Sequence, residues 1–419
     1  MAWRTPPSLL GYRVTLYLLA PVLLAFNAWQ AARAADPRLF WQRLGLFLPR
    51  RNDAPLWLHA ASVGELMAAR PLIAALRLRH PRLPLLVTTF TPTAARLARA
   101  RLPAGVEHLY LPLDWPGAVR RFLCALQPRA ALIMETELWP NLFARLERED
   151  VPLLIVNARL SARTFETRGW IRRLHAVSLK RVDAVLARSD SDAAAYIRLG
   201  APPERVRTVG NIKYAAPPGE EDIPPTDLGR PYILAASTHE DEERQLAAIW
   251  RDLQRDDYLL VIAPRHPGRR EAILQQLRPL AQEIAVRSRA ETPNDRTGIY
   301  LADTLGELEG FMAGAALVFM GGSLVPRGGH NILEPARLGR PILFGPHMDN
   351  FREESELLLA EEAALRVADT GELRAALQRA LDGDPTIARL GHNVRRVMER
   401  QGEVLERYLE RVLSYCELE

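Results

Sequence analysis

The sequence predicts an α/β protein made of two doubly wound domains, each built on a parallel sheet. Short apolar runs of strand length alternate with amphipathic stretches of helical length from about residue 55 onward. The alternation stops at a proline-rich, acidic segment and then starts again, and 419 residues are enough for two domains of ordinary size. Strands that alternate with helices form right-handed βαβ units, and therefore a parallel sheet.

The first domain is predicted from five apolar runs, each followed by a helical stretch. Runs of this length, bounded by polar residues and spaced by helices, are typical of buried parallel strands. The predicted strands are residues 56–58, 85–87, 130–134, 153–156 and 182–187. The helices that follow them are expected to begin near Glu65, Thr93, Trp139, after Arg163 and near Asp190.

A linker is expected between the domains, because residues 215–230 carry four prolines and several acidic residues but no apolar periodicity. Beyond it, predicted strands recur at residues 232–235, 259–263, 315–320 and 342–344. The expected divisions are an N-terminal segment (1–34), a first domain (35–212), a linker (213–227), a second domain (228–385) and a C-terminal helix (386–419). Ligands of such sheets bind beyond the carboxyl ends of the strands, so a cleft between the two domains is the expected site.

The N-terminal segment carries a signal for membrane association. Residues 14–32 are uncharged and rich in Leu, Val and Ala, and they are bounded by Arg13 and Arg33. This length can just span a bilayer. Basic residues are denser after the segment than before it, which predicts that the bulk of the chain lies on the cytoplasmic side of the membrane.

Two alternatives to a spanning helix stay open. An amphipathic helix lying on the membrane surface is one, because Pro21 and Asn27 weaken a span. A signal peptide is the other, since residues 32–34 imitate a cleavage site. A basic mature start argues against export, so an anchor or a surface helix is favoured.

The composition excludes several classes of protein. With 48% apolar and 25% charged residues the chain is globular, and its net charge of +5 without a long basic run does not favour nucleic acid as a partner.

Cys124 and Cys416 lie far apart in the sequence, which fits free thiols in a reducing compartment. Lys180 and Lys213 are the two lysines among many arginines, so either could be retained as a compact point charge or be a surface residue.

The stretch 319–345 says most about function. A predicted strand ends in the glycine pair 321–322, a second pair follows at 328–329, and a short helix precedes another strand. Such a Gly-rich loop before a helix N-terminus suits an anionic ligand such as a nucleotide phosphate. The polar residues after the second pair are His330, Asn331 and Glu334. Asn331 and Glu334 could also form a simple capping box.

Glu65 is the first candidate for acid–base chemistry. It opens the helix after the first strand, in the sequence HAASVGE at 59–65, where a carboxylate would sit at the mouth of the sheet. The helix dipole is expected to favour its ionised form, which suits a general base. Stabilising the helix start is an equally good interpretation of the same residue.

A second pair of carboxylates, Glu135 and Glu137, follows the predicted strand 130–134. On an extended chain the two side chains would share one face. They are candidates for acid–base groups, or for groups that position neighbouring arginines.

Further candidate ligands lie at strand ends of the second domain and at the hinge. Arg265, after Pro264, could clamp a phosphate or a carboxylate. The segment 304–307 is either a helix cap or a backbone contact for a base, and Lys213 lies at the domain junction. The D-x-D at 190–192 more simply caps a helix, and the absence of H-E-x-x-H, CxxC and Walker-type sequences argues against a protein-bound metal.

Seven motifs in fixed order resemble a known family. Together they are similar to the 3-deoxy-D-manno-octulosonic acid (Kdo) transferases of lipopolysaccharide biosynthesis, inverting glycosyltransferases with the GT-B fold. The only mild departure is Leu305, where the family has Met before Gly-Glu. The motifs are HAASVGE (59–65), METELWPNL (134–142), NARLS (157–161), VGNIK (209–213), APRHP (263–267), DTLGEL (303–308) and GGHNILEP (328–335).

The resemblance implies transfer of Kdo from CMP-Kdo to a lipid A precursor, lipid IVA, at the inner membrane without a metal or other cofactor. It implies that Glu65 is the general base and that Glu135 and Lys213 support the transition state, with Glu137 competing for the role of Glu135. The residues that it implies for holding CMP are Pro264, Arg265, Leu305, Gly306, Glu307, Asn331, Ile332, Leu333 and Glu334. A nucleotide-sugar 2-epimerase of the same fold, and a non-catalytic sugar-nucleotide or lipid-binding protein, remain as alternatives.

Overall fold

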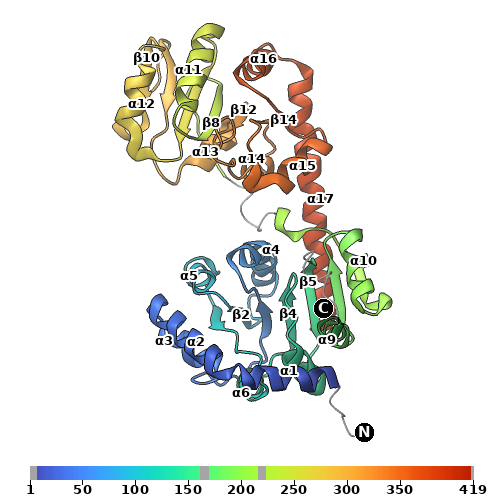
Figure 1. Ribbon diagram of the computed structural model, residues 1–419. Helices are drawn as coiled ribbons and strands as arrows, with labels where there is room; N and C mark the ends of the chain where they lie inside the picture. The colour runs from blue at the N-terminus through green and yellow to red at the C-terminus, as the bar shows by residue number, and fades with distance from the viewer. Residues whose placement is uncertain (1–6, 161–168, 216–222, 417–419) are drawn as a thin grey trace. The chain divides into compact units, whose positions relative to one another are not determined.

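The computed structural model describes residues 7–160, 169–215 and 223–416 (Figure 1). Two compact units are present: residues 1–218 with 401–419, and residues 219–400. The expected helix start after Arg163 and much of the predicted linker lie outside the described residues. Each unit is an α/β layer structure.

The first unit is built on a seven-stranded parallel sheet of order β3-β2-β1-β4-β5-β6-β7. Its strands are β1 (Leu56–His59), β2 (Leu85–Thr89), β3 (Val106–Tyr110), β4 (Ala130–Met134), β5 (Leu153–Ala158), β6 (Ala184–Ala187) and β7 (Val206–Thr208). Its helices are α1 (Pro7–Leu18), α2 (Ala20–Ala34), α3 (Pro37–Arg43), α4 (Val63–Arg79), α5 (Pro92–Arg101), α6 (Pro116–Leu126), α7 (Pro140–Arg148), α9 (Gly169–Leu179) and α10 (Asp190–Leu199), with 3₁₀ turns η1 (Pro203–Arg205) and η2 (Ile212–Tyr214).

The second unit repeats this plan with a parallel sheet of order β10-β11-β9-β8-β12-β13-β14. Its strands are β8 (Tyr232–Thr238), β9 (Leu259–Pro264), β10 (Glu283–Val286), β11 (Thr297–Leu301), β12 (Leu317–Met320), β13 (Ile342–Phe344) and β14 (Leu365–Arg366). Its helices are α11 (Glu242–Leu253), α12 (Arg270–Leu277), α13 (Leu308–Gly314), α14 (Leu333–Arg337), α15 (Arg352–Ala360) and α16 (Thr370–Leu381), with 3₁₀ turns η3 (Pro267–Arg269), η4 (Arg287–Arg289) and η5 (Asp349–Phe351).

Helices cover both faces of each sheet, so alternate residues of a strand enter different cores. In β1, Leu56 and Leu58 pack into one cluster with α4, while Trp57 packs into another with α6 and α7. The central strands are buried along their whole length. Burial of one such aliphatic side chain contributes about 1.5–3 kcal/mol, which explains why the uncharged runs in the sequence form the middle of each sheet.

The long C-terminal helix α17 (Pro385–Tyr415) serves both cores. Val394 and Val397 pack in the second unit. Leu405 and Tyr408 pack in the first, where the Tyr408 hydroxyl donates to the Gly210 carbonyl at 2.9 Å.

The N-terminal segment forms two helices rather than one. Among the described residues, no single helix is both long enough and apolar enough to cross a bilayer. Residues of α1 and α2 satisfy that requirement together, but the chain bends by 61° between Leu18 and Ala20.

Candidate active site

The candidate residues of the first unit lie at the carboxyl ends of neighbouring strands. Glu65 follows β1, Glu135 follows β4, and Asn157 lies near the end of β5. Strand β4 pairs with both β1 and β5, so these three ends are adjacent. Lys213 lies in η2, which packs against α4, the helix that Glu65 opens.

Glu65 is held in place by the start of its own helix. Ser62 is the N-cap of α4, and its hydroxyl accepts from the Glu65 backbone N–H at 3.3 Å and donates to Glu65 Oε1 at 3.0 Å. The Ala61 backbone N–H donates to Glu65 Oε2 at 2.8 Å. These contacts resemble a capping box. The two interpretations of Glu65 therefore do not exclude each other, because the cap contacts also fix the carboxylate at the strand end.

The pKa of Glu65 differs from what the helix dipole alone predicts. Burial is the largest cause and, with the nearby carboxylates of Glu137 and Glu135, it raises the pKa of Glu65 to about 7, against the lowering contribution of the Ala61 N–H bond. The ionised form is therefore less favoured than the helix dipole alone predicts. A general base is most effective when its pKa lies near the working pH, so a pKa of about 7 suits proton abstraction.

Glu135 and Glu137 do not lie on an extended strand, so the prediction that they share a strand face is wrong. Glu135 has a φ of +54° in the turn after β4, a conformation that is costly for a residue other than glycine. The Tyr196 hydroxyl donates to the Glu135 carbonyl at 2.7 Å. Burial raises the pKa of Glu137. Both carboxylates act electrostatically on Glu65, which places them in one cluster.

The predicted donor residues of the second unit lie after three strands of its sheet. Pro264 ends β9, and Arg265 is exposed, with its backbone N–H donating to the Thr238 carbonyl at 3.0 Å. Arg265 acts electrostatically on Glu334 and on His330. The loop after β12 is therefore close to the end of β9.

The segment after β11 presents polar and exposed groups. Leu305 is 84% exposed, and Gly306 has a φ of +86°. Arg287 Nη2 donates to Glu307 Oε1 at 2.6 Å. This hydrogen bond is the largest of the causes that lower the pKa of Glu307 to about 2. The Thr304 hydroxyl also bonds to Glu307. Glu307 is therefore ionised and held at the edge of this strand end.

The loop before α14 forms the contact between Asn331 and Glu334 that a capping box predicts. Asn331 Nδ2 donates to Glu334 Oε1 at 3.1 Å, and Asn331 Oδ1 accepts from the Leu333 N–H at 3.2 Å. Ile332 and Leu333 are buried, so they could offer a ligand only their backbone. Helix α14 has five residues, too few for the strong helix dipole that the sequence suggested. An anion bound here would have to be held by the loop and by basic side chains instead.

Sequence reasoning predicted β8, the strand that lies between β9 and β12 in the sheet, but missed the polar residues that follow it. Its end carries His239, and α11 begins with Glu242. Glu242 is fully buried and accepts four backbone N–H groups, those of His239 at 2.9 Å, Gly322 at 2.7 Å, Ser323 at 3.1 Å and Leu324 at 3.0 Å. The run STHEDEE at 237–243 was the available signal, since a polar run that follows a buried strand marks a candidate site.

Gly322 is required where this loop meets β8. Its φ is +66°, and a Cβ there would come within 3.1 Å of His330 Cδ2 and 3.2 Å of His239 Cδ2. Glycine thus lets the loop approach both histidines, and Glu242 fixes the loop in that position.

The D-x-D at 190–192 is a helix cap. The Ser189 hydroxyl donates to Asp192 Oδ2 at 2.6 Å, and Asp192 also pairs with Arg188 at 3.1 Å. Over the described ranges, no three His, Cys, Asp or Glu side chains are grouped as they would be to hold a metal ion.

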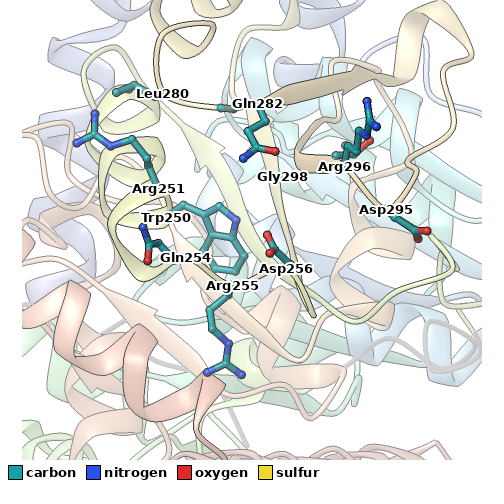
Figure 2. Close-up of a pocket in the computed structure, with 12 residues that line it drawn as sticks. Trp250, Arg251, Gln254, Arg255, Asp256, Leu280, Gln282, Asp295, Arg296 and Gly298 are labelled. Atoms are coloured by element: carbon teal, nitrogen blue, oxygen red, sulfur yellow. The ribbon is translucent and has the colours of Figure 1, made fainter.

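A cavity of about 680 Å³ lies elsewhere on the second unit (Figure 2). Trp250, Gln254 and Asp256 line it near the amino end of β9, and Thr297 lines it at the amino end of β11. It is thus at the opposite edge of the sheet from the candidate donor residues. Ligands of parallel sheets bind at the carboxyl ends, so this cavity is not the candidate site.

Comparison with known proteins gives consistent similarities. The family profile described as 3-deoxy-D-manno-octulosonic-acid transferase (kdotransferase) matches residues 38–216. The 3-deoxy-D-manno-octulosonic acid transferase of Haemophilus influenzae is 33% identical over 419 residues, covering 97% of this chain and 98% of that protein. The same enzyme of Bordetella pertussis is 35% identical over 399 residues, covering 88% and 90%.

Among solved structures, the UDP-GlcNAc 2-epimerase from Neisseria meningitidis bound to UDP-GlcNAc is 14% identical, with 86% of this chain and 100% of that chain covered and a TM-score of 0.53. That likeness concerns the fold alone. The identity to the transferases extends over nearly their whole length, and the two seven-stranded parallel sheets have the GT-B-like arrangement. The chain belongs to the Kdo transferase family of glycosyltransferases.

Proposed function

We propose that this glycosyltransferase moves Kdo from CMP-Kdo to lipid IVA with inversion at the anomeric carbon, and that Glu65 is the general base. The observation that carries the proposal is the fixed Glu65 carboxylate, whose pKa is raised to about 7. Glu65 would take the proton of the acceptor hydroxyl while the oxygen of that hydroxyl forms the bond to the anomeric carbon. The bond to CMP breaks on the opposite side, and its electron pair stays on the phosphate oxygen.

The side chains at the carboxyl ends of the strands in each unit support a reaction that needs no metal ion. CMP leaves as a phosphate anion, which cationic side chains and hydrogen-bond donors can stabilise. Arg265 in the second unit and Lys213 in the first are exposed cations at the candidate sites. We propose that Arg265 contacts the donor phosphate and that Lys213, with Glu135, supports the transition state.

A mass-spectrometric transfer assay tests this function. The purified protein is incubated with tetra-acylated lipid IVA and CMP-Kdo made in situ, and a chelator is added to half of the samples after donor synthesis. The expected result is a mass gain of one or more Kdo units on the lipid, unchanged by the chelator. Release of an epimerised free sugar without any lipid product would instead support the 2-epimerase alternative.

We also propose that α1–α3 lie on the cytoplasmic face of the inner membrane rather than span it. Large apolar side chains on these helices, and at the break between α1 and α2, are exposed: Leu10, Val14, Tyr17, Leu18, Leu19, Val22, Phe26, Trp29 and Trp41. Polar contacts hold the helices to the rest of the first unit, since Arg43 Nη2 donates to the Phe90 carbonyl at 2.5 Å and Arg13 Nε donates to Asn141 Oδ1 at 2.7 Å. Figure 1 shows both α1 and α2 lying against the first unit.

This arrangement would bring a lipid acceptor to the catalytic carboxylates. Asn141, the partner of Arg13, belongs to the segment after β4 that carries Glu135 and Glu137. An apolar helix face with basic flanks suits the boundary between headgroups and acyl chains. The helices would therefore serve to place the acceptor as well as to hold the enzyme at the membrane.

The double variant Leu18→Glu/Val22→Glu should weaken binding to anionic phospholipid vesicles at least tenfold, because two exposed apolar side chains that each contribute about 1–2 kcal/mol are replaced by charges. Flotation of the protein with vesicles measures this. Leu78→Glu is the matched control, since Leu78 is 65% exposed but lies on α4. Equal loss of binding in the control, or unchanged binding in the double variant, would contradict a surface role for α1 and α2.

A further inference from the structure

Two histidines from different strand ends face each other at the candidate donor site. His239 follows β8, and His330 lies in the loop between β12 and α14. Their Nε2 atoms are 2.8 Å apart, and their rings are parallel, with centroids 5.1 Å apart at an interplanar angle of 2°. His266, after β9, meets the His239 ring edge-on, with centroids 5.8 Å apart.

This contact limits how many protons the pair can hold. Two Nε2 atoms at hydrogen-bond distance require that one ring donates and the other accepts. One added proton is compatible with the bond, because an imidazolium can donate to a neutral imidazole. A second would place two charged donors against each other. The pair can therefore gain one proton without breaking its hydrogen bond.

The surroundings of the pair are mostly basic. His239 is faced by Arg265, His266 and Arg269 from the end of β9 and by Arg327 from the loop after β12. Arg269 is paired with the buried Glu243 at 3.0 Å, and Glu242 accepts the His239 backbone N–H at 2.9 Å from beneath. Burial first, and then these cations, lower the pKa of His239, and the pKa of His330 falls to about 4. Without a ligand the pair is therefore neutral near neutral pH.

Binding of an anion would shift the pair from its neutral form toward its protonated form. It would offset the arginines electrostatically and favour a protonated imidazole beside it. The pair lies next to Gly322 and close to Arg265, so it belongs to the strand ends where the donor is proposed to bind.

We propose that the His239–His330 pair contacts an anionic oxygen group of the donor and takes up one proton from solvent as the donor binds. The inference rests on the proposed function and deepens its donor site. The donor carries two such groups, the phosphate of CMP and the carboxylate of Kdo. With the phosphate, the added charge would face the oxygen that receives the electron pair when the sugar leaves, and the proton would return to solvent as CMP dissociates.

Calorimetry in two buffers with different ionisation enthalpies tests the inference, because it counts the protons taken up on binding. The probe is cytidine 5′-methyl phosphate, a diester like the donor, which lacks the second phosphate ionisation near pH 6. Free Kdo supplies the carboxylate alone, and cytidine supplies neither anion. Wild-type protein should take up at least about half a proton with the diester between about pH 5 and pH 6.5, a range that lies between a lowered and an ordinary histidine pKa.

The double variant His239→Gln/His330→Gln should bind the diester up to about tenfold more weakly and without proton uptake, because glutamine keeps a polar group at each Nε2 position but does not titrate there. His392→Gln, an exposed histidine on α17, should retain the uptake of the wild type. Uptake with the diester assigns the pair to the phosphate, and uptake with Kdo alone assigns it to the carboxylate. Diester binding without uptake, together with no uptake on addition of Kdo, would overturn this inference alone. Failure of both CMP and the diester to bind would contradict the proposed donor site as well.

Discussion

Glu65→Gln is expected to slow Kdo transfer about 10²–10⁴-fold, the usual contribution of a general base, while CMP binding stays unchanged. Glutamine can still accept the Ala61 N–H bond that Glu65 Oε2 accepts at 2.8 Å, and it is as suitable as glutamate in a capping box. It cannot take a proton from the acceptor hydroxyl. Rates of transfer with saturating donor, together with CMP titrations, measure both effects.

Asp192→Asn is the matched control for this variant. Asp192 forms the same kind of cap at α10, with its backbone N–H donating to the Ser189 hydroxyl at 3.1 Å. Asparagine keeps this backbone bond but loses the charge that pairs with Arg188 at 3.1 Å, a contact that contributes up to about 1 kcal/mol, so this control should unfold slightly earlier but keep its transfer rate. If Glu65→Gln turned over at nearly the wild-type rate, or if both variants lost activity equally, Glu65 would not be the base.

Glu242→Gln is expected to destabilise the second unit by about 2–5 kcal/mol and to weaken CMP binding. Each carboxylate oxygen of Glu242 accepts two backbone N–H groups, so an amide nitrogen in place of either oxygen leaves two buried donors unpaired. Each such group costs about 1–3 kcal/mol. The loop 322–324 should then lose its fixed position beside His239. Denaturant unfolding and CMP titration are the measurements.

Glu372→Gln provides the comparison for this prediction. Glu372 also accepts a backbone N–H, that of Ala368 at 2.7 Å, but this bond is exposed. The variant should change stability by less than about 1 kcal/mol and leave CMP binding intact. Wild-type stability and CMP affinity in Glu242→Gln would show that the loop does not depend on this carboxylate.

The middle of each sheet could be predicted from the sequence because its strands are buried on both faces. Runs such as residues 130–134 and 153–156 lack charged residues for that reason. The edge strands β3, β7, β10 and β14 were missed, and so was β11, the neighbour of β10. They are short or carry polar side chains, as in Val106–Tyr110, where Glu107 is exposed. Edge strands have one paired neighbour and less burial, so their sequences resemble loops.

The candidate site was predictable only where local sequence determines it. Glu65 was recognised because a helix start follows a strand within a few residues. The raised pKa of Glu65 was not, since it depends on burial and on Glu135 and Glu137, about 70 residues further along the chain. Glu242 was not predicted for the same reason, because three of its four hydrogen bonds come from the backbone of residues 322–324, some 80 positions away.

The pH dependence of the transfer rate in wild type and Glu65→Gln, with donor saturating, tests the central claim most directly. The pKa of Glu65 is about 7, and only the deprotonated carboxylate can accept a proton. The wild-type rate should therefore rise with pH through about pH 7 and level off above it, while the residual rate of Glu65→Gln should lack this rise. The same rise in Glu65→Gln, or a wild-type rate that falls over this range, would contradict the assignment of Glu65 as the base.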